Sequence, residues 1–397
     1  MSSVDKRIRD GRTTWLARWR DPAGEQHKRT FAKRIDAERH LIGVESHILD
    51  GSYIDPARSR VTVKVWGEQW LAAQVQLKES TRVRYEGLLR GHIEPKWGSV
   101  PLAKIGHADV AAWVAGLSAS DLSGSTVRQA HRVFSLLLAL AVRDGRLTRN
   151  PAEGVKLPRA NKVEKTFLTH EQVNALAEAA GTLKETGANG VESSEDRRLA
   201  GERRAIILVL SYCGLRWGEL AGLKVGRVDL LRRRLIVAEA VTEVRGRLVW
   251  GTPKTHQQRS VPIPRFLVND LAVVMAGKAP GDVVFTTRRG AVLRNLNFRR
   301  DAFDPAATAV GLEGLTPHEL RHTAASLAVS SGANVKAVQR MLGHASAAMT
   351  LDTYAGLFDD DLDGLSDRMD KAALAARVPR ACPEGTVTDL DERRATS

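Results

Sequence analysis

Two Pro- and Gly-containing breaks divide the sequence into three segments with different hydrophobic patterns. The first break is Asp55-Pro56, and the second is the charged stretch NPAEGVKLPRANKVEK at residues 150–165. Proline and glycine interrupt helices and strands, and such a composition is typical of a linker between domains. At roughly 150 residues per domain, the 397 residues suggest two or three domains, and the two breaks favour three.

Composition excludes several classes of protein. The hydrophobic content of 43% and the charged content of 27% are close to globular averages, which excludes wholesale disorder. No apolar run approaches the ~20 residues that a membrane span needs, and residues 1–12 lack the apolar stretch of a secretory signal. The two cysteines, Cys213 and Cys382, are too few for a disulfide framework or a cysteine-based zinc module. We therefore expect a soluble cytoplasmic protein.

The chain is basic along most of its length. Lys and Arg number 60 against 46 Asp and Glu, which gives a formal net charge of +14. The excess is +4 in residues 1–60, +6 in residues 61–160 and +4 in residues 161–375. A basic tail would indicate one nonspecific arm, whereas three basic segments favour a protein that lies along nucleic acid. A basic surface that is merely solvated is the alternative.

The first segment predicts a small three-stranded sheet followed by one helix, within residues 1–56. Period-two alternation predicts a strand over residues 13–21, and a return strand is expected over residues 27–32. Helical spacing of apolar residues, ended by a glycine, predicts a helix over residues 33–51. On the polar face of the first strand, Arg18 and Arg20 could contact DNA, and a solvated strand face is about as well supported.

The second segment, residues 61–150, predicts a bundle of four helices. Four stretches have apolar residues at helical spacing, and each is bounded by Ser, Thr, Gly or Pro, over residues 62–77, 80–93, 107–117 and 123–145. Several arginines lie away from the apolar stripes and are candidate phosphate contacts as a group, namely Arg82, Arg84, Arg90, Arg128 and Arg132.

The third segment, residues 166–376, is long enough for one mixed α/β domain in which helical patterns dominate. Strand candidates lie at residues 233–241, 246–251 and 282–286, and the polar stretch 181–202 predicts a surface loop. Residues 377–397 have little apolar content, so we expect a flexible tail.

A helix start marks the most distinctive stretch of this segment. Thr316-Pro317-His318-Glu319 is a capping box with proline at the first helical position, so a helix should begin at Pro317. His318 and Arg321 then lie three residues apart on its first turn, where free N–H groups favour an anionic ligand.

The same residues also fit the zinc-protease pattern H-E-x-x-H, with His318 and His322 as the ligands. Such a site needs a third protein ligand, and none occurs at a familiar spacing. Arg321 would also place a cation beside the dication. We therefore expect no metal.

Six residues in this order resemble the catalytic signature of the tyrosine recombinases, also called phage-type integrases. The matching patterns are GLRWGEL, TPKT, HELRHT, LGHAS and TLDTYAGL. They contain the candidate catalytic residues Arg216, Lys254, His318, Arg321, His344 and Tyr354. The resemblance extends over about residues 6–375. It implies an arm-type DNA-binding domain at residues 1–56, a core-DNA-binding domain at 61–150, a linker at 151–165 and a catalytic domain at 166–376.

The residue types suit phosphodiester chemistry. Arg216 and Arg321 can each clamp a phosphate bidentately, and Tyr354 is a hydroxyl nucleophile that requires activation. The resemblance implies that Tyr354 forms a 3′-phosphotyrosyl link, that Lys254 protonates the 5′ leaving oxygen, and that His318 assists proton transfer at the nucleophile. It also implies that His344 hydrogen-bonds the scissile phosphate and that a buried Glu219 orients Arg216. No metal and no nucleotide cofactor is implied.

Taken singly, each residue has a plainer interpretation, such as a surface ion pair between Arg216 and Glu219. Together they favour a site-specific DNA recombinase that integrates, and with a directionality factor excises, a phage or other mobile element. The alternatives are a non-catalytic helix-turn-helix regulator and a relaxing type IB topoisomerase.

The implied partners are double-stranded DNA, at core and arm attachment sites, and further copies of the chain in a tetramer on DNA. An arm-binding domain is also compatible with an excisionase and a DNA-bending host protein. We expect no membrane partner, and a location in the cytoplasm at the nucleoid of a bacterial host.

Overall fold

The computed structural model describes residues 2–9, 12–22, 24–51, 53–55, 58–159, 166–182, 194–253, 258–354 and 362–376. The chain divides into two compact units, Met1–Val163 and Glu164–Ser397. The division falls inside the segment predicted as a linker. No helix among the described residues is long and apolar enough to cross a membrane.

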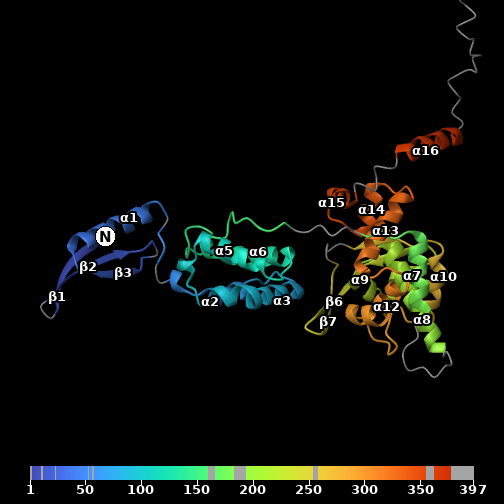
Figure 1. Ribbon diagram of the computed structural model, residues 1–397, viewed down its shortest axis with the longest axis horizontal. Helices are drawn as coiled ribbons and strands as arrows, with labels where there is room; N and C mark the ends of the chain where they lie inside the picture. Colours follow the sequence, from blue (N-terminus) through green and yellow to red (C-terminus); the bar gives the residue numbers. More distant parts are fainter. Residues whose placement is uncertain are drawn as a thin grey trace, which may run out of the picture. The chain divides into compact units, whose positions relative to one another are not determined.

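The first unit begins with an antiparallel sheet and one helix (Figure 1). Strands β1 (Ser3–Arg9), β2 (Arg12–Arg20) and β3 (Gln26–Phe31) pair in chain order, and helix α1 (Arg34–Leu49) packs on the sheet. Ala17 and Trp19 of β2 form a small core with α1, as the alternation predicts. The predicted three-stranded sheet plus helix is confirmed.

A bundle of helices follows and has its own core. Its elements are η1 (Arg58–Arg60), α2 (Val63–Ala72), α3 (Glu79–Leu88), the π-helical turn η2 (Leu89–Ile93), α4 (Glu94–Trp97), η3 (Leu102–Lys104), α5 (His107–Ala119) and α6 (Gly124–Arg143). Phe134 stacks on Trp97 with ring centroids 5.4 Å apart and meets Trp113 edge-on at 5.3 Å. The predicted helical bundle is confirmed.

The segment after α6 packs on this bundle before the described residues stop at Arg159. Ala152 and Val155 are buried in the bundle core. The carbonyl oxygen of Ala152 lies 3.0 Å from His131 Nε2 of α6. Part of the segment predicted as a linker is therefore held by the helical domain.

The second unit is mostly helical. Its helices are α7 (His170–Thr182), α8 (Ser194–Cys213), α9 (Trp217–Ala221), η4 (Val225–Arg227), α10 (Leu267–Met275), α11 (Asn295–Phe298), the π-helical turn η5 (Arg299–Phe303), α12 (Asp304–Ala309), α13 (Pro317–Ser330), α14 (Val335–Leu342), α15 (Ala347–Tyr354) and α16 (Leu362–Ala375). Helix α8 packs against α7, α10 and α13 (Figure 1).

Two small antiparallel sheets complete the unit. One has the order β4 (Val228–Asp229), β5 (Arg234–Val237), β8 (Arg259–Pro262), and the other pairs β6 (Ala240–Val244) with β7 (Arg247–Gly251). The predicted mixed, mainly α architecture is confirmed.

Two local predictions for this unit were wrong. Residues 194–202 are not loop but the start of α8, because Leu199 and Glu202 turn inward and acidic residues occupy the first helical turn. Residues 282–286 form isolated bridges and not a strand. Strands β7 and β8 are not paired with each other, since β7 pairs with β6 and β8 pairs with β5.

Candidate active site

The chain turns sharply at Gly214, between α8 and α9. Gly214 has a φ of +65°, a left-handed conformation that glycine adopts without strain. A Cβ at this position would lie 2.8 Å from Leu342 Cδ2. The turn makes Arg216 the N-cap residue of α9. One turn later, Glu219 accepts hydrogen bonds from the Arg216 backbone N–H and from Arg216 Nη1, each at 2.9 Å.

Arg259 of β8 binds the Glu219 carboxylate as well. Its Nη1 donates to Glu219 Oε1 at 2.9 Å and its Nη2 to Oε2 at 2.5 Å, while its Nε donates to the carbonyl oxygen of Met341 at 3.0 Å. The side chains of Glu219 and Arg259 are only 1% and 8% exposed. That of Arg216 is 25% exposed, so Arg216 is the arginine of this trio that reaches the surface.

Arg216 and Arg259 keep the Glu219 carboxyl group ionised. Burial acts to raise the pKa of the carboxyl, but hydrogen bonds and charge from Arg259, together with those from Arg216, outweigh it and lower the pKa to about 2. Because one carboxylate is shared between two guanidinium groups, this trio keeps a net positive charge.

Arg321 of α13 is buried at 3% exposure and donates from Nη1 and Nη2 to the carbonyl oxygens of Gly214 and Leu342. These carbonyls lie at the C-terminal ends of α8 and α14, where helix carbonyls lack helical partners and a cation is favoured. Burial, with the nearby charge of Arg216, lowers the pKa of Arg321 to about 9. Arg321 therefore remains protonated at neutral pH and joins three helices.

The C-terminal end of α14 positions a histidine and a tyrosine. Gly343 ends the helix with a φ of +66°, and His344 follows it. His344 Nδ1 lies 3.0 Å from Thr350 Oγ1, and its ring stacks on that of Tyr354, with centroids 6.4 Å apart and planes at 6°.

Tyr354, the last residue of α15, is 2% exposed. Burial raises the pKa of its phenol to about 12, while the charge of Arg321 acts in the opposite direction. The phenol is therefore protonated at neutral pH. Its Oη lies 2.7 Å from His322 Nδ1 of α13.

The candidate catalytic residues are thus brought together from separate helices. Arg216, Arg321, His344 and Tyr354 are linked by charge, by ring stacking and through the C-terminal end of α14, and the predicted partner of Arg216, Glu219, binds Arg216 and Arg259. His318 lies on the first turn of α13, exposed, with its ring edge-on to that of His322 at 5.2 Å. Lys254 lies outside the described residues.

The acidic residue of the H-E-x-x-H pattern, Glu319, has a structural role at the start of α13. Helix α13 begins at Pro317 as predicted, and Glu319 Oε2 accepts hydrogen bonds from Thr316 N at 2.7 Å and Thr316 Oγ1 at 2.9 Å. Glu319 therefore caps the helix. Among the described residues, the group of three His, Cys, Asp or Glu side chains close enough to share an ion is elsewhere, at Asp21, Glu25 and His27.

Sequence reasoning missed two residues of this cluster, Arg259 and His322. Arg259 gives no local signal, because its partners Glu219 and Met341 are 40 and 82 residues away in the chain. His322 was considered only as a zinc ligand, although its place four residues after His318 puts both on one helix face.

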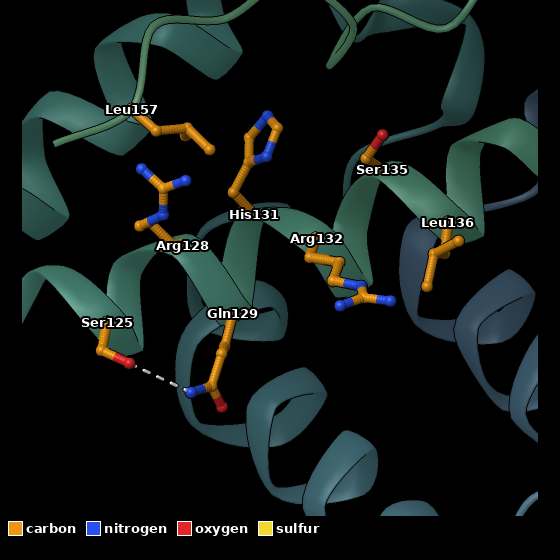
Figure 2. A pocket seen from close by; sticks show the side chains of 8 residues that line it. All are labelled: Ser125, Arg128, Gln129, His131, Arg132, Ser135, Leu136 and Leu157. Atoms are coloured by element: carbon orange, nitrogen blue, oxygen red, sulfur yellow. Dashed lines mark hydrogen bonds between the residues drawn. The ribbon is translucent and has the colours of Figure 1, made fainter. Parts of the chain in front are cut away.

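The arginines of the helical domain lie on its surface. Those predicted to contact DNA are all exposed, namely Arg82, Arg84, Arg90, Arg128 and Arg132. Arg128 and Arg132 of α6 line a pocket of about 490 Å³, together with Leu157 of the following segment (Figure 2). Arg128 Nη1 also donates to the carbonyl oxygen of Pro158 at 3.1 Å. We call Arg128 and Arg132 the α6 arginines.

In the N-terminal sheet, Arg18 and Arg20 both lie on β2. Arg18 is half-buried, and its Nε lies 3.2 Å from Asp5 Oδ2 of β1. Arg20 is exposed, and its Nη1 donates to the carbonyl oxygen of Gly24 at 3.4 Å.

Comparison with known proteins decides the family. The profile of the Phage integrase family matches residues 166–360, and that of the Phage integrase, N-terminal SAM-like domain matches residues 62–118. Tyrosine recombinase XerD of Mycobacterium leprae is 30% identical over 271 residues, which cover 64% of this chain and 78% of XerD. The chain belongs to the tyrosine recombinase family.

Further relatives agree with this assignment. The integrase of Mycobacterium phage D29 is 28% identical over 342 residues, which cover 81% of this chain and 84% of that integrase. Among solved structures, the Tn1549 transposon integrase in complex with transposon right end DNA matches 79% of this recombinase and all of that chain, with a TM-score of 0.65 and 21% identity. A lambda integrase tetramer bound to a Holliday junction matches 86% of this recombinase and 96% of that chain, with a TM-score of 0.56 and 20% identity. At these identities the two structures establish the shared fold.

Proposed function

We propose that this tyrosine recombinase integrates a phage or other mobile element by cutting and rejoining DNA at attachment sites through a 3′-phosphotyrosyl intermediate. The observation that carries the proposal is the position of Tyr354, whose phenol lies within the charge field of Arg321 and against the ring of His344. A hydroxyl nucleophile beside fixed cations is the arrangement that phosphoryl transfer requires.

In the proposed reaction, Arg216 and Arg321 hold the scissile phosphate and stabilise the charge that develops on its non-bridging oxygens. Tyr354 Oη attacks phosphorus, the 5′ oxygen leaves with a proton from Lys254, and His344 donates a hydrogen bond to the phosphate. His318, exposed on the first turn of α13 with its ring edge-on to that of His322, assists proton transfer at the nucleophile. Rejoining is the reverse reaction with the 5′-hydroxyl of a second strand. The cations are built into the protein, so the proposed mechanism uses no metal.

The domain assignment is part of the proposal. Residues 61–150 would bind core DNA, and the α6 arginines, exposed beside a pocket, support phosphate contacts there. Residues 1–56 would bind arm sites through the face of β2 that carries Arg18 and Arg20. Residues 151–165 would connect the DNA-binding part to the catalytic domain at 166–376, and residues 377–397 would form a tail.

We also propose that the recombinase acts as a tetramer on DNA, in the cytoplasm at the nucleoid of a bacterial host. The lambda integrase tetramer on a Holliday junction supports this assembly through the shared fold. An excisionase and a DNA-bending host protein would complete the excision reaction.

A nicked suicide DNA substrate tests the chemistry. The wild-type protein should form a protein–DNA adduct that survives denaturation, and Tyr354→Phe should bind the same DNA without forming one. An adduct in the Phe variant would place the nucleophile elsewhere, and no adduct in the wild type would favour a non-catalytic regulator. Transfer of strands between two sites, rather than relaxation of supercoils alone, separates a recombinase from a type IB topoisomerase.

A further inference from the structure

Two helices hold His344, one by its backbone and the other by its ring. At the end of α14, Gln339 Nε2 donates to the His344 carbonyl oxygen at 3.1 Å, and the His344 N–H donates to the Gln339 carbonyl oxygen at 3.1 Å. On α15, Thr350 Oγ1 lies 3.0 Å from Nδ1, and Tyr354 stacks on the ring. Stacking restricts the plane of the imidazole, so the hydrogen bond to Thr350 selects which ring edge faces α15.

The hydroxyl of Thr350 is buried, with 0% of the residue exposed. The hydroxyls of Ser118 and Ser331, by contrast, donate to the carbonyl oxygen four residues earlier, at 2.8 and 2.7 Å. Among the residues that the structure describes, the partner of the Thr350 hydroxyl is His344 Nδ1. A buried donor that lacks an acceptor is costly, so the hydroxyl hydrogen points at Nδ1.

This direction of the hydrogen bond sets the tautomer of His344. A neutral imidazole has one N–H and one acceptor nitrogen. Because Nδ1 accepts from Thr350, the ring hydrogen of His344 is on Nε2. A neutral histidine that donates to the scissile phosphate needs its hydrogen on the nitrogen that faces the phosphate, and the partner of the other nitrogen determines where that hydrogen lies.

We propose that Thr350 is the positioning residue of His344. Its hydroxyl donates to Nδ1 and thereby holds the ring with Nε2–H as the donor to the scissile phosphate. The inference rests on the function proposed above, in which His344 makes that hydrogen bond. Thr350 acts through His344 and takes no part in bond making or proton transfer.

A second buried threonine of the same domain provides a matched control. Thr323 of α13 is also 0% exposed, and its Oγ1 accepts a hydrogen bond from the Leu168 N–H at 3.2 Å. Its partner is a backbone group and not one of the candidate catalytic side chains. Thr323→Val therefore separates the loss of a buried hydroxyl in general from the loss of the one that orients His344.

The first test measures single-turnover adduct formation by the full chain on the nicked suicide duplex. Valine keeps the shape of threonine without the hydroxyl, whereas serine keeps the hydroxyl without the methyl group. We expect Thr350→Val to bind DNA normally and to cleave roughly 10–100-fold more slowly, the range for partners that orient metal-binding histidines. Thr350→Ser should melt at a lower temperature, because it loses a buried methyl group, but should cleave at nearly the wild-type rate. Thr323→Val should cleave normally.

The second test measures the tautomer directly. Nitrogen-15 chemical shifts of the histidine rings are recorded for the full chain, and the His344 signals are assigned by their absence from His344→Gln. We expect the neutral ring of the wild type to carry its hydrogen on Nε2, and Thr350→Val to shift the signal of Nδ1.

Cleavage at the wild-type rate by Thr350→Val, or a hydrogen on Nδ1 of the wild type, would overturn the inference and leave the proposed function intact. Slow cleavage by Thr350→Ser together with normal cleavage by Thr350→Val would assign Thr350 a packing role and also overturn it. Absence of an adduct in the wild type would instead count against the proposed function itself. Should Thr350→Val fail to fold, the ring tautomer of the wild type decides.

Discussion

The arginines of the catalytic domain and those of the helical domain differ in what holds them. Arg216, Arg259 and Arg321 are tied to one carboxylate and to carbonyl oxygens at helix ends. The α6 arginines extend from an exposed helix face, and one of them makes a hydrogen bond to a backbone carbonyl. A guanidinium held in place presents its hydrogen-bond donors in a fixed geometry, whereas an exposed one contributes mainly its charge. The two regions should therefore respond differently to the same substitutions.

The largest effect is expected where a buried partner is removed. Arg259→Met leaves the Glu219 carboxylate buried with Arg216 alone, and breaking such a pair costs about 3–5 kcal/mol. The additional change Glu219→Gln removes the stranded charge and should recover part of this loss. Urea unfolding of the single and double variants measures both. Equal stability of Arg259→Met and the wild type would show that the cluster is not coupled as its hydrogen bonds indicate.

Acid should weaken the same cluster. The pKa of Glu219 is lowered from an ordinary 4.5 to about 2, so its stabilising contribution is present above about pH 4.5 and is lost as pH falls toward 2. This lowering of the pKa corresponds to about 3 kcal/mol of unfolding free energy. The difference in unfolding free energy between the wild type and Glu219→Gln should therefore shrink between about pH 6 and pH 3. A difference that is constant over this range would contradict the paired carboxylate.

A smaller effect is expected from changing an exposed arginine of the helical domain. Arg132→Ala should weaken DNA binding without changing the rate of cleavage at saturating protein. The plot of log affinity against log salt should lose about 0.9 of slope, the value for one phosphate contact. Titrations at several salt concentrations measure this. An unchanged slope would mean that Arg132 contacts no phosphate.

The smallest effect is expected from chelators. Because the cations of the proposed mechanism are arginines and a lysine, excess EDTA should leave cleavage of the suicide substrate unchanged. Activity lost in EDTA and restored by zinc would instead support the H-E-x-x-H interpretation of His318 and His322.

Local patterns predicted the elements of this protein well and their long-range contacts poorly. Alternation located β2, and the capping box located the first residue of α13, because both signals lie within a few neighbouring residues. The prediction of a strand at residues 282–286 was wrong, because an apolar run does not specify a pairing partner. For the same reason the pattern did not show that β7 and β8 pair with different strands.

The candidate site shows the same limit. Motif resemblance selected Arg216, Arg321, His344 and Tyr354, which the fold brings together. It did not select Arg259, whose role depends on a carboxylate and a carbonyl that are distant in the chain. Contacts of this kind are properties of the packed structure, and no spacing in the sequence encodes them.

The comparison between fixed and exposed arginines is tested most directly by one matched pair of variants, Arg216→Lys and Arg132→Lys. Lysine keeps the charge but loses the planar fork that makes two parallel hydrogen bonds. Binding and single-turnover cleavage are measured for both on one substrate. We predict that Arg216→Lys binds DNA normally but cleaves roughly 10²–10³-fold more slowly, the cost of losing a preorganised donor, and that Arg132→Lys changes neither. Cleavage by Arg216→Lys at the wild-type rate would contradict the account.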